Sequence, residues 1–220
     1  MARKAGMIHV VCDNARVFGQ LATELMPGID IVHFVDGGLP SMTAEAQRPR
    51  IVERLRALAV FAEESGAEAI LLTCTAFGRL VDVVQSSVTC PVLSVLEVMV
   101  DEALTLCGSI GIVGSHPGTL ESASRMLREQ ACLEGREIDI KTSLCPGAFD
   151  AMRRDDWATH NRIVLAALQE LAQQVDVILA PQPSIERTVV EFAESHPEVL
   201  ILTSPRLSAL RLRQVLDALS

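Results

Sequence analysis

Short apolar runs alternate with longer segments of helical period along the whole chain of 220 residues. The runs are rich in valine, isoleucine and leucine, which favours buried strands, and the segments between them are long enough for helical crossovers. This alternation predicts an α/β fold with mostly parallel sheets that helices cover on both faces. We expect strands at 8–12, 31–35, 69–73, 91–95, 109–114, 138–144, 177–180 and 199–203, and helices at 18–26, 44–65, 78–86, 95–107, 120–132, 150–174, 185–195 and 207–219.

The order strand, loop, helix, strand occurs twice with nearly the same spacing. Residues 68–77 followed by 90–95 correspond to residues 175–184 followed by 197–203. The repetition predicts two pseudo-symmetric lobes, each a mostly parallel sheet flanked by helices, with the active site in the cleft between them. The expected lobes are residues 1–97, to which a terminal helix within 206–220 packs back, and residues 98–205.

The composition excludes several classes of function. A net charge of −9 without a clustered basic face argues against nucleic acid as a partner. Membrane spans need about 20 apolar residues, and no run here approaches that length. The N-terminus shows no signal-peptide core, so we expect a cytoplasmic protein with no membrane partner.

The six cysteines form no CxxC pair and no Cys/His spacing that suits zinc, so we expect neither a metal site nor disulfides. Four of them lie in or beside apolar stretches, which is typical of small core residues. These are Cys12, Cys90, Cys107 and Cys132.

Cys74 differs from these four because it follows an apolar strand and lies between two threonines, just before an expected helix. Ligands of parallel sheets bind where strands end and helices begin. The positive end of a helix dipole favours a thiolate, so we expect a lowered pKa and a reactive thiol. Neighbouring backbone N–H groups and the Thr75 hydroxyl are suited to hold a carboxylate or enolate oxygen. The alternative is a buried structural cysteine.

Several short motifs occur in an order that resembles the aspartate/glutamate racemase superfamily, which also contains hydantoin racemases, maleate isomerases and arylmalonate decarboxylases. Residues 73–76 (Thr-Cys-Thr-Ala) look like its first cysteine motif, and residues 114–122 (Gly-Ser-His-Pro-Gly-Thr-Leu-Glu-Ser) resemble its central loop. Asp13 matches the aspartate after the first strand of the glutamate racemases, and residues 202–206 resemble the final strand and turn. The resemblance covers nearly the whole chain.

The resemblance implies proton transfer at the α-carbon of the substrate without a cofactor. Two cysteines on opposite faces of that carbon serve the racemases of the superfamily. Here the second motif falls on residues 181–184 (Pro-Gln-Pro-Ser), so Gln182 stands in place of the second cysteine. An amide cannot exchange a proton near neutral pH, whereas a thiol can.

Three mechanisms stay open for a chain with Gln182 in place of the second cysteine. His116, on a polar turn, is the candidate for the second proton-transfer group, because histidine side chains exchange protons near neutral pH; its alternative is an exposed loop histidine. Cys145 is a weaker candidate, with a core position as its alternative. A decarboxylase of a malonate-type acid needs only one proton donor, which Cys74 would supply to the enediolate. A thiolate that adds to an alkene, as resemblance to the maleate isomerases suggests, needs Cys74 as a nucleophile.

The same motifs supply side chains and backbone groups for binding a small carboxylate. For Thr75 and Thr119 the alternative is helix capping, and for Asp13 it is a simple turn position. The expected substrate-binding residues are Asp13, Asn14, Thr75, Ala76, Ser115, Gly118, Thr119, Gln182, Pro183 and Ser184.

Taken together, these features predict an isomerase, a racemase-like enzyme of amino-acid metabolism that acts on an amino acid or a related small carboxylate, with Cys74 as acid/base and His116 as second catalytic group. The alternatives are the decarboxylase and a binding protein that holds a small acid without catalysis. The resemblance also implies a homo-oligomer, most simply a dimer.

Overall fold

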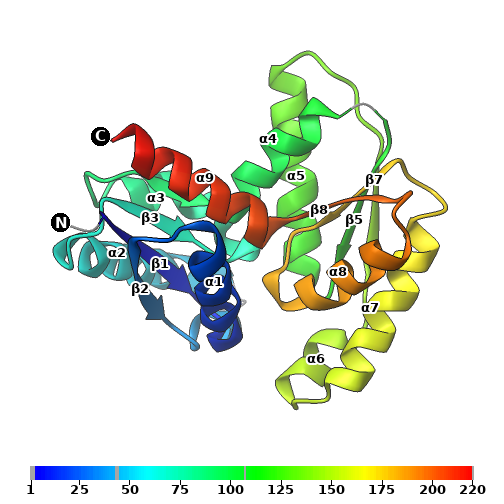
Figure 1. Ribbon diagram of the computed structural model, residues 1–220, viewed down its shortest axis with the longest axis horizontal. Helices are drawn as coiled ribbons and strands as arrows, with labels where there is room; N and C mark the ends of the chain where they lie inside the picture. Colours follow the sequence, from blue (N-terminus) through cyan, green and yellow to red (C-terminus); the bar gives the residue numbers. More distant parts are fainter. Residues whose placement is uncertain (1–2, 43–44, 107, 220) are drawn as a thin grey trace. The chain divides into compact units, whose positions relative to one another are not determined.

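The computed structural model describes residues 3–42, 45–106 and 108–219, and the chain divides into two compact units. The first unit comprises Met1–Val98 and Pro205–Ser220, and the second comprises Met99–Ser204. Each unit has one four-stranded parallel sheet with helices on both faces (Figure 1). The α/β class with two lobes, predicted from the alternation, is therefore confirmed.

The sheet of the first unit has the strand order β2-β1-β3-β4. One face packs against α2 and α3, in a core that includes Leu55 and Val84; the other face packs against α1 and α9. The elements are β1 (Arg3–His9), α1 (Cys12–Leu25), β2 (Ile29–Val35), α2 (Arg48–Glu64), β3 (Ala69–Leu72), α3 (Val81–Gln85), β4 (Val92–Ser94) and α9 (Ser204–Ala218), with 3-10 helices η1 (Leu39–Ser41), η2 (Glu45–Gln47) and η3 (Thr75–Leu80).

The last helix belongs to the core of the first unit although it comes last in the chain. Ala209, Leu212 and Leu216 of α9 are fully buried in the cluster that holds Ala5 and Met7 of β1. The guanidinium of Arg213 donates to the carbonyl oxygen of Leu25 at 2.9 Å, at the C-terminus of α1.

The sheet of the second unit has the order β6-β5-β7-β8, which is the order of the first sheet with four added to each strand number. Core residues such as Val113, Leu168 and Phe192 fill one face. The elements are α4 (Val95–Thr105), which begins in the first unit, β5 (Ile110–Gly114), α5 (Pro117–Leu133), β6 (Ile140–Leu144), α6 (Ala148–Arg153), α7 (Trp157–Leu171), β7 (Val177–Ala180), 3-10 helix η4 (Pro183–Ile185), α8 (Glu186–Ser195) and β8 (Leu200–Thr203).

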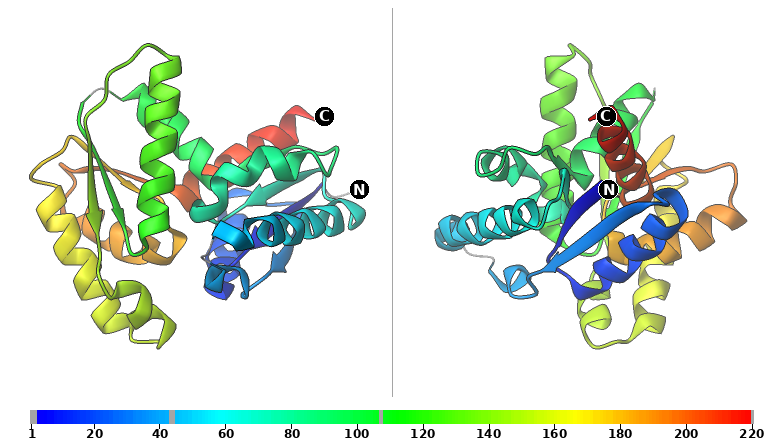
Figure 2. Two further views of the ribbon diagram at one scale, coloured as in Figure 1. Left: turned by 180° about the vertical axis from the view of Figure 1, so that it is seen from behind. Right: turned by 60° about the vertical axis from the view of Figure 1, so that its left-hand side comes forward.

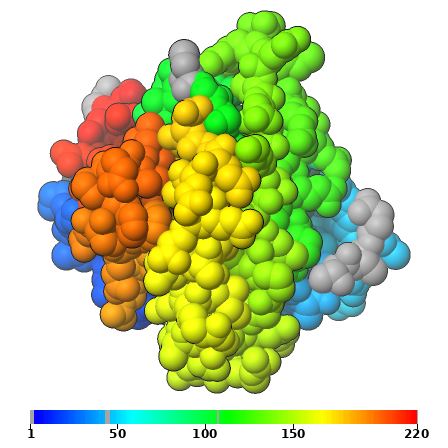
Figure 3. Space-filling view, turned by 90° about the vertical axis from the view of Figure 1, so that its right-hand side faces the viewer, coloured from blue at the N-terminus to red at the C-terminus, as the bar shows by residue number. Residues whose placement is uncertain are grey.

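Helices α5 and α7 cover opposite faces of this second sheet (Figure 2). Helices α7 and α8 run side by side on one face (Figure 3). A side chain at Gly111 would bring its Cβ within 2.8 Å of Leu171 and Val175, so this glycine lets α7 approach β5 closely.

Several boundaries differ from those expected. The first strand begins at Arg3 rather than at residue 8 and ends at His9, because its pairing with β2 extends through the polar residues Arg3 and Lys4. The expected helix at 150–174 is broken between α6 and α7, where Asp155 has a φ of 60°. Asp156 caps the N-terminus of α7, since its carboxylate accepts from the N–H of Thr159 at 3.1 Å.

The expectation that four cysteines are core residues is wrong for two of them. Cys12, in the first turn of α1, and Cys132, in the last turn of α5, are exposed, whereas Asn14 and Ala131 in the same turns are buried, so the two cysteines lie on the outer faces of their helices. Cys90 is half-buried and packs against the first core, whereas Cys107, like residues 43 and 44, lies outside the described residues. Among the helices of the described part of the chain, none is both long and apolar enough to cross a bilayer.

In each sheet there is one place where the chain changes the side of the sheet on which it adds the next strand. After β1 the chain moves to β2 on one side and then returns to β3 on the other; after β5 it moves to β6 and returns to β7. Such a switch point, at the carboxyl ends of the two central strands, is where open α/β sheets bind ligands. The loops after β1 and β3, and those after β5 and β7, are therefore the positions to inspect for a site.

Candidate active site

Cys74 lies two residues beyond the buried strand β3, at the switch point of the first sheet. Its backbone is extended, with φ −104° and ψ 113°, and it occupies the position that precedes the 3-10 helix η3. The backbone N–H groups of Phe77 and Ala76 lower the pKa of the thiol by favouring the thiolate, and the Phe77 N–H also donates to the Cys74 carbonyl oxygen at 3.2 Å. The thiol is thus held at a strand end with two peptide donors directed at it.

Burial raises the pKa of the Cys74 thiol to about 11, and the N–H groups of Phe77 and Ala76 offset this only in part. The expected lowering by a helix dipole is therefore wrong. The segment after Cys74 starts as a 3-10 helix, and the α-helix that follows, α3, has only 5 residues. Few peptide dipoles are aligned on the thiol, so desolvation of the thiolate outweighs their effect.

Gly78 allows η3 to pack tightly against the neighbouring strand. A Cβ at this position would lie 2.8 Å from Ser94 Oγ and 3.0 Å from Leu96 Cβ. Ser94 is fully buried, and its Oγ accepts from the N–H of Leu96 at 3.1 Å. The close approach fixes the turn that carries Phe77 and Ala76 over the Cys74 sulfur.

A buried polar chain that the sequence analysis missed ends beside Cys74. Thr73 Oγ1 lies 2.8 Å from His9 Nδ1, and His9 Nε2 lies 2.8 Å from Nδ1 of the exposed His33. Thr73 Oγ1 also donates to the carbonyl oxygen of Ile8 at 2.9 Å. The three side chains come from the ends of the neighbouring strands β1, β2 and β3, so strand pairing alone brings them together.

The donor and the acceptor in each of these hydrogen bonds follow from the number of hydrogens that each side chain carries. Thr73 has one hydroxyl hydrogen, which Ile8 receives, so His9 Nδ1 must donate to Thr73 Oγ1. Neutral His9 then has an accepting Nε2, to which His33 donates. Burial, followed by the charge of His33, lowers the pKa of His9 to about 3, so His9 is neutral at ordinary pH. Period-2 alternation places His9 among core residues, but no sequence pattern pairs it with His33.

The predicted residues after β1 lie in the first turn of α1, at the same end of the sheet as Cys74. Asn14 is buried, and its N–H donates to the carbonyl oxygen of Val11 at 3.1 Å. Asp13 forms an ion pair with Arg16, 2.9 Å from Nε, which raises the pKa of Arg16. Asp13 is thus a helix residue with a partner on its own helix, and not a simple turn residue.

In the second unit, Gln182 follows β7 and reaches the loop after β5. Its Oε1 accepts from the N–H of Ser115 at 2.6 Å and from the Ser115 hydroxyl at 3.4 Å, and both side chains are buried. A Cβ on Gly114 would lie 3.0 Å from this Oε1. Since a peptide N–H can only donate, the amide oxygen must face Ser115, which turns the NH₂ group away from it.

His116 caps the N-terminus of α5. Its Nδ1 accepts from the N–H of Gly118 at 3.1 Å, and its ring lies edge-on to that of Phe149 at 5.4 Å. An accepting Nδ1 assigns the hydrogen of neutral imidazole to Nε2. A Cβ on Gly118 would lie 3.2 Å from this Nδ1, so glycine keeps room for the cap.

The hydroxyls of Thr75 and Thr119 are not helix caps, since Cys74 and His116 occupy the capping positions. Both threonines are buried, at 3% and 2% exposure. Pro183 is buried in η4, and Ser184 and Ala76 are half-buried. The fold therefore gathers the predicted residues into two groups, one at the switch point of each sheet.

Cys145 is a core residue, which was the alternative to its role as proton donor. It is fully buried among Val113, Ala148 and Ile185, and its N–H donates to the carbonyl oxygen of Gly114. Burial raises the pKa of its thiol to about 11. Within the described residues, no three His, Cys, Asp or Glu side chains gather as a metal site.

Each unit has a parallel sheet flanked by helices, and the two sheets have equivalent switch points. At the switch point of the first sheet lies a cysteine between two threonines. These features define an α/β protein of two similar lobes with candidate sites at the carboxyl ends of the strands. The family model of the Asp/Glu/hydantoin racemases matches residues 24–181, so the chain belongs to that family. This confirms the resemblance found in the motifs. A comparison with curated proteins gives no significant match.

Solved structures of racemases share the fold. A glutamate racemase isoform from Bacillus anthracis superposes with a TM-score of 0.73 at 18% identity, over 99% of this chain and 83% of the other. An aspartate racemase from Picrophilus torridus has a TM-score of 0.74 at 10% identity, covering 98% and 94%. An allantoin racemase from Klebsiella pneumoniae has a TM-score of 0.70 at 16% identity, covering 99% and 88%.

Proposed function

We propose that the protein is a cofactor-independent racemase or isomerase that acts at the α-carbon of an amino acid or related small carboxylate, with Cys74 as the acid/base. The observation that carries this proposal is the place of Cys74 at a switch point, with the N–H groups of Ala76 and Phe77 on its sulfur. Family membership and the racemases among the fold neighbours support the class of reaction.

The chemistry suits a thiol with a raised pKa. Removal of an α-proton needs a strong base, and a thiolate whose conjugate acid has a pKa of about 11 is a stronger base than an ordinary cysteine thiolate. The two peptide N–H groups stabilise the negative sulfur when it forms. The resting thiol is the acid form, ready to return a proton to an enediolate.

Racemisation also needs a second group that transfers a proton on the opposite face of the α-carbon. We assign this role to His116, which is half-buried and carries its hydrogen on Nε2 when neutral. Gln182 cannot exchange a proton, and Cys145 is enclosed in the core. The NH₂ group of Gln182 is left to donate to a substrate carboxylate.

Gln182 favours a second candidate, the decarboxylation of a malonate-type acid. The bond from the α-carbon to one carboxylate breaks, CO₂ leaves, and the electron pair stays as an enediolate. The S–H of Cys74 then protonates the carbon, and water restores the thiol. This reaction needs one proton donor and an amide that binds the remaining carboxylate, which is what Cys74 and Gln182 supply.

Solvent exchange separates these reactions. The enzyme is incubated in deuterated water with panels of amino acids, hydantoins and malonates, and NMR follows α-deuteration, inversion and CO₂ release. Inversion that Cys74→Ala abolishes, and His116→Asn strongly reduces, is the result expected of the racemase. CO₂ release with deuteration on one face supports the decarboxylase instead.

The matched control is Cys132→Ala, which removes an exposed thiol and should leave every rate unchanged. Full activity of Cys74→Ala would refute both proposals. Saturable binding of a panel member, with neither exchange nor CO₂ release, would instead favour a protein that only binds a small acid.

A further inference from the structure

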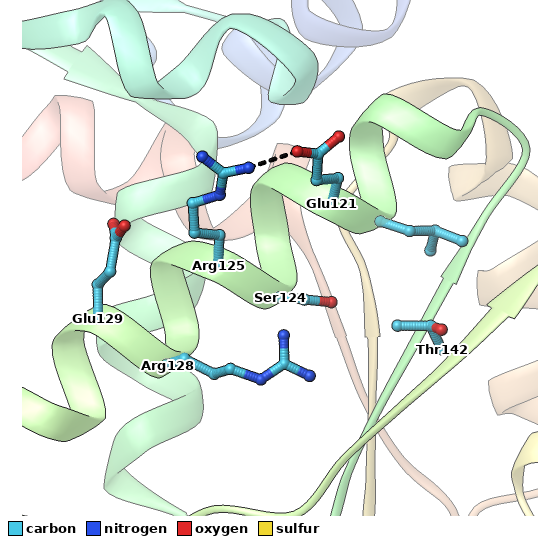
Figure 4. A pocket seen from close by; sticks show the side chains of 7 residues that line it. Glu121, Ser124, Arg125, Arg128, Glu129 and Thr142 are labelled. Atoms are coloured by element: carbon cyan, nitrogen blue, oxygen red, sulfur yellow. Dashed lines mark hydrogen bonds and ion pairs between the residues drawn. The ribbon is translucent and has the colours of Figure 1, made fainter.

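A groove of about 470 Å³ lies along α5 beside the edge strand β6 of the second unit (Figure 4). Its walls come from a face of α5 beyond Thr119 and from Thr142 of β6, so it contains none of the residues assigned to the reaction. Volumes of this size are typical of small-molecule sites.

The two sides of the groove differ in charge. The side chains of Ser124, Arg128 and Thr142 lie between the helix and the strand, and this side carries a guanidinium and two hydroxyls (Figure 4). Glu121 and Glu129 lie on the outer side of α5, where Glu121 forms an ion pair with Arg125. The strand side of the groove is thus cationic.

Ser124 supplies an unsatisfied hydroxyl. The residue is 6% exposed, and its Oγ has no hydrogen-bond partner among the described residues. A serine inside a helix commonly donates to the carbonyl oxygen four residues earlier, but Ser124 does not make that bond. Buried hydroxyls are almost always paired, so this group calls for a partner from outside the fold.

Arg128 supplies the charge. Its side chain is exposed, and within the part of the chain that the structure describes it forms no ion pair or hydrogen bond, whereas Arg125, one turn earlier, is paired with Glu121. A guanidinium offers five N–H donors in a planar fork that fits the oxygens of a carboxylate or a phosphate.

We propose that this groove binds a small oxyanion, a carboxylate or phosphate group, through the Arg128 guanidinium and the hydroxyls of Ser124 and Thr142. The site is separate from Cys74 and does not depend on the proposed reaction. Arg128 neutralises the anion, and Ser124 donates the hydrogen that the fold leaves unused.

The test uses the whole isotope-labelled protein at constant ionic strength. Inorganic phosphate and succinate are titrated separately, and NMR follows the backbone amides of Ser124 and Thr142. We expect saturable shifts with at least one of the two probes. Arg128→Gln should weaken that binding by about tenfold or more, because it removes a charge-assisted bidentate contact. Saturation with one probe alone distinguishes a phosphate site from a carboxylate site.

Ser124→Ala provides a second readout. It should weaken binding several-fold while leaving the melting temperature unchanged or higher, since the fold loses no hydrogen bond. Arg162→Gln, an exposed arginine on α7 outside the groove, is the matched control for charge and should leave affinity unchanged. Absence of saturable shifts, or equal weakening by Arg162→Gln and Arg128→Gln, would overturn the proposal.

Discussion

The side-chain oxygen of Gln182 accepts a hydrogen bond from the backbone N–H of Ser115, with 2.6 Å between Oε1 and N. The bond joins the loop after β7 to the loop after β5, across the switch point of the second sheet. Gln182, which the motif resemblance aligns with the second cysteine of the racemases, therefore fixes the geometry of two neighbouring loops.

Replacing Gln182 by cysteine tests both the structural role of this side chain and its effect on proton exchange. Gln182→Cys should lower the free energy of unfolding by about 1–3 kcal/mol, because the buried Ser115 N–H loses its acceptor. It should also accelerate inversion relative to decarboxylation, because a thiol can exchange a proton. Urea denaturation and the solvent-exchange assay measure the two effects. Gln182→Glu keeps an acceptor for Ser115 and should stay closer to the parent in stability; a Cys variant as stable as the parent contradicts the argument.

The raised pKa of Cys74 predicts slow alkylation at neutral pH. Only the thiolate reacts, so the rate should rise about tenfold for each pH unit up to a pH near 11. Mass spectrometry after timed iodoacetamide treatment gives the rate at each cysteine separately, with exposed Cys132 as internal reference. If the alkylation rate of Cys74 levelled off below pH 8, the pKa of its thiol would be below 8, and the prediction would be wrong.

Burial of neutral His9 predicts a loss of stability in acid. The pKa of His9 is about 3 in the folded protein and near 6.5 when the chain is unfolded, so the unfolded state binds the extra proton. Stability is then complete above pH 6.5 and falls by up to about 1.4 kcal/mol per pH unit between 6.5 and 3. His9→Asn retains a donor toward Thr73 without a titrating ring, so its urea midpoint should depend less on pH. Equal pH slopes for both proteins would contradict this assignment.

Gly78→Ala should destabilise the turn that holds Cys74. The new methyl group would lie 2.8 Å from Ser94 Oγ and 3.0 Å from Leu96 Cβ, both in the packed interior. Overpacking of this kind costs about 1–3 kcal/mol. Gly37→Ala is the matched control, since its Cβ would meet nothing within 4 Å and its φ is not positive. Thermal unfolding of the two variants should therefore give clearly different midpoints.

Regular alternation of apolar runs was sufficient to predict the α/β class, because strand burial on both faces leaves a strong local pattern. The helix at 150–174 shows the limit of that pattern. Its periodicity continues through Asp155, but the positive φ of that residue is a backbone choice that apolar spacing does not reveal. The 3-10 helix η3 after Cys74 was likewise not predicted, because apolar spacing does not distinguish a 3-10 turn from an α-helical turn.

The sequence indicated candidate residues for the site, but it did not indicate the chemical surroundings in which the fold places them. Position at a strand end, together with the family motifs, indicated Cys74, His116 and Gln182. The pKa of Cys74 depends on how completely neighbouring strands exclude water, which is a property of the packed structure. The contact between His9 and His33 joins residues 24 positions apart through strand register, and local sequence carries no sign of it.

The position of helix α9 in the chain determines which of the two units can complete its core first during synthesis. The core of the first unit includes Ala209, Leu212 and Leu216, so it stays incomplete until the ribosome has made these residues, which follow the whole of the second unit. The second unit, Met99–Ser204, is one continuous stretch and has all its parts earlier. Although domains usually fold in the order in which they emerge, the unit that carries Cys74 begins to emerge before the second unit and can complete its core only after it.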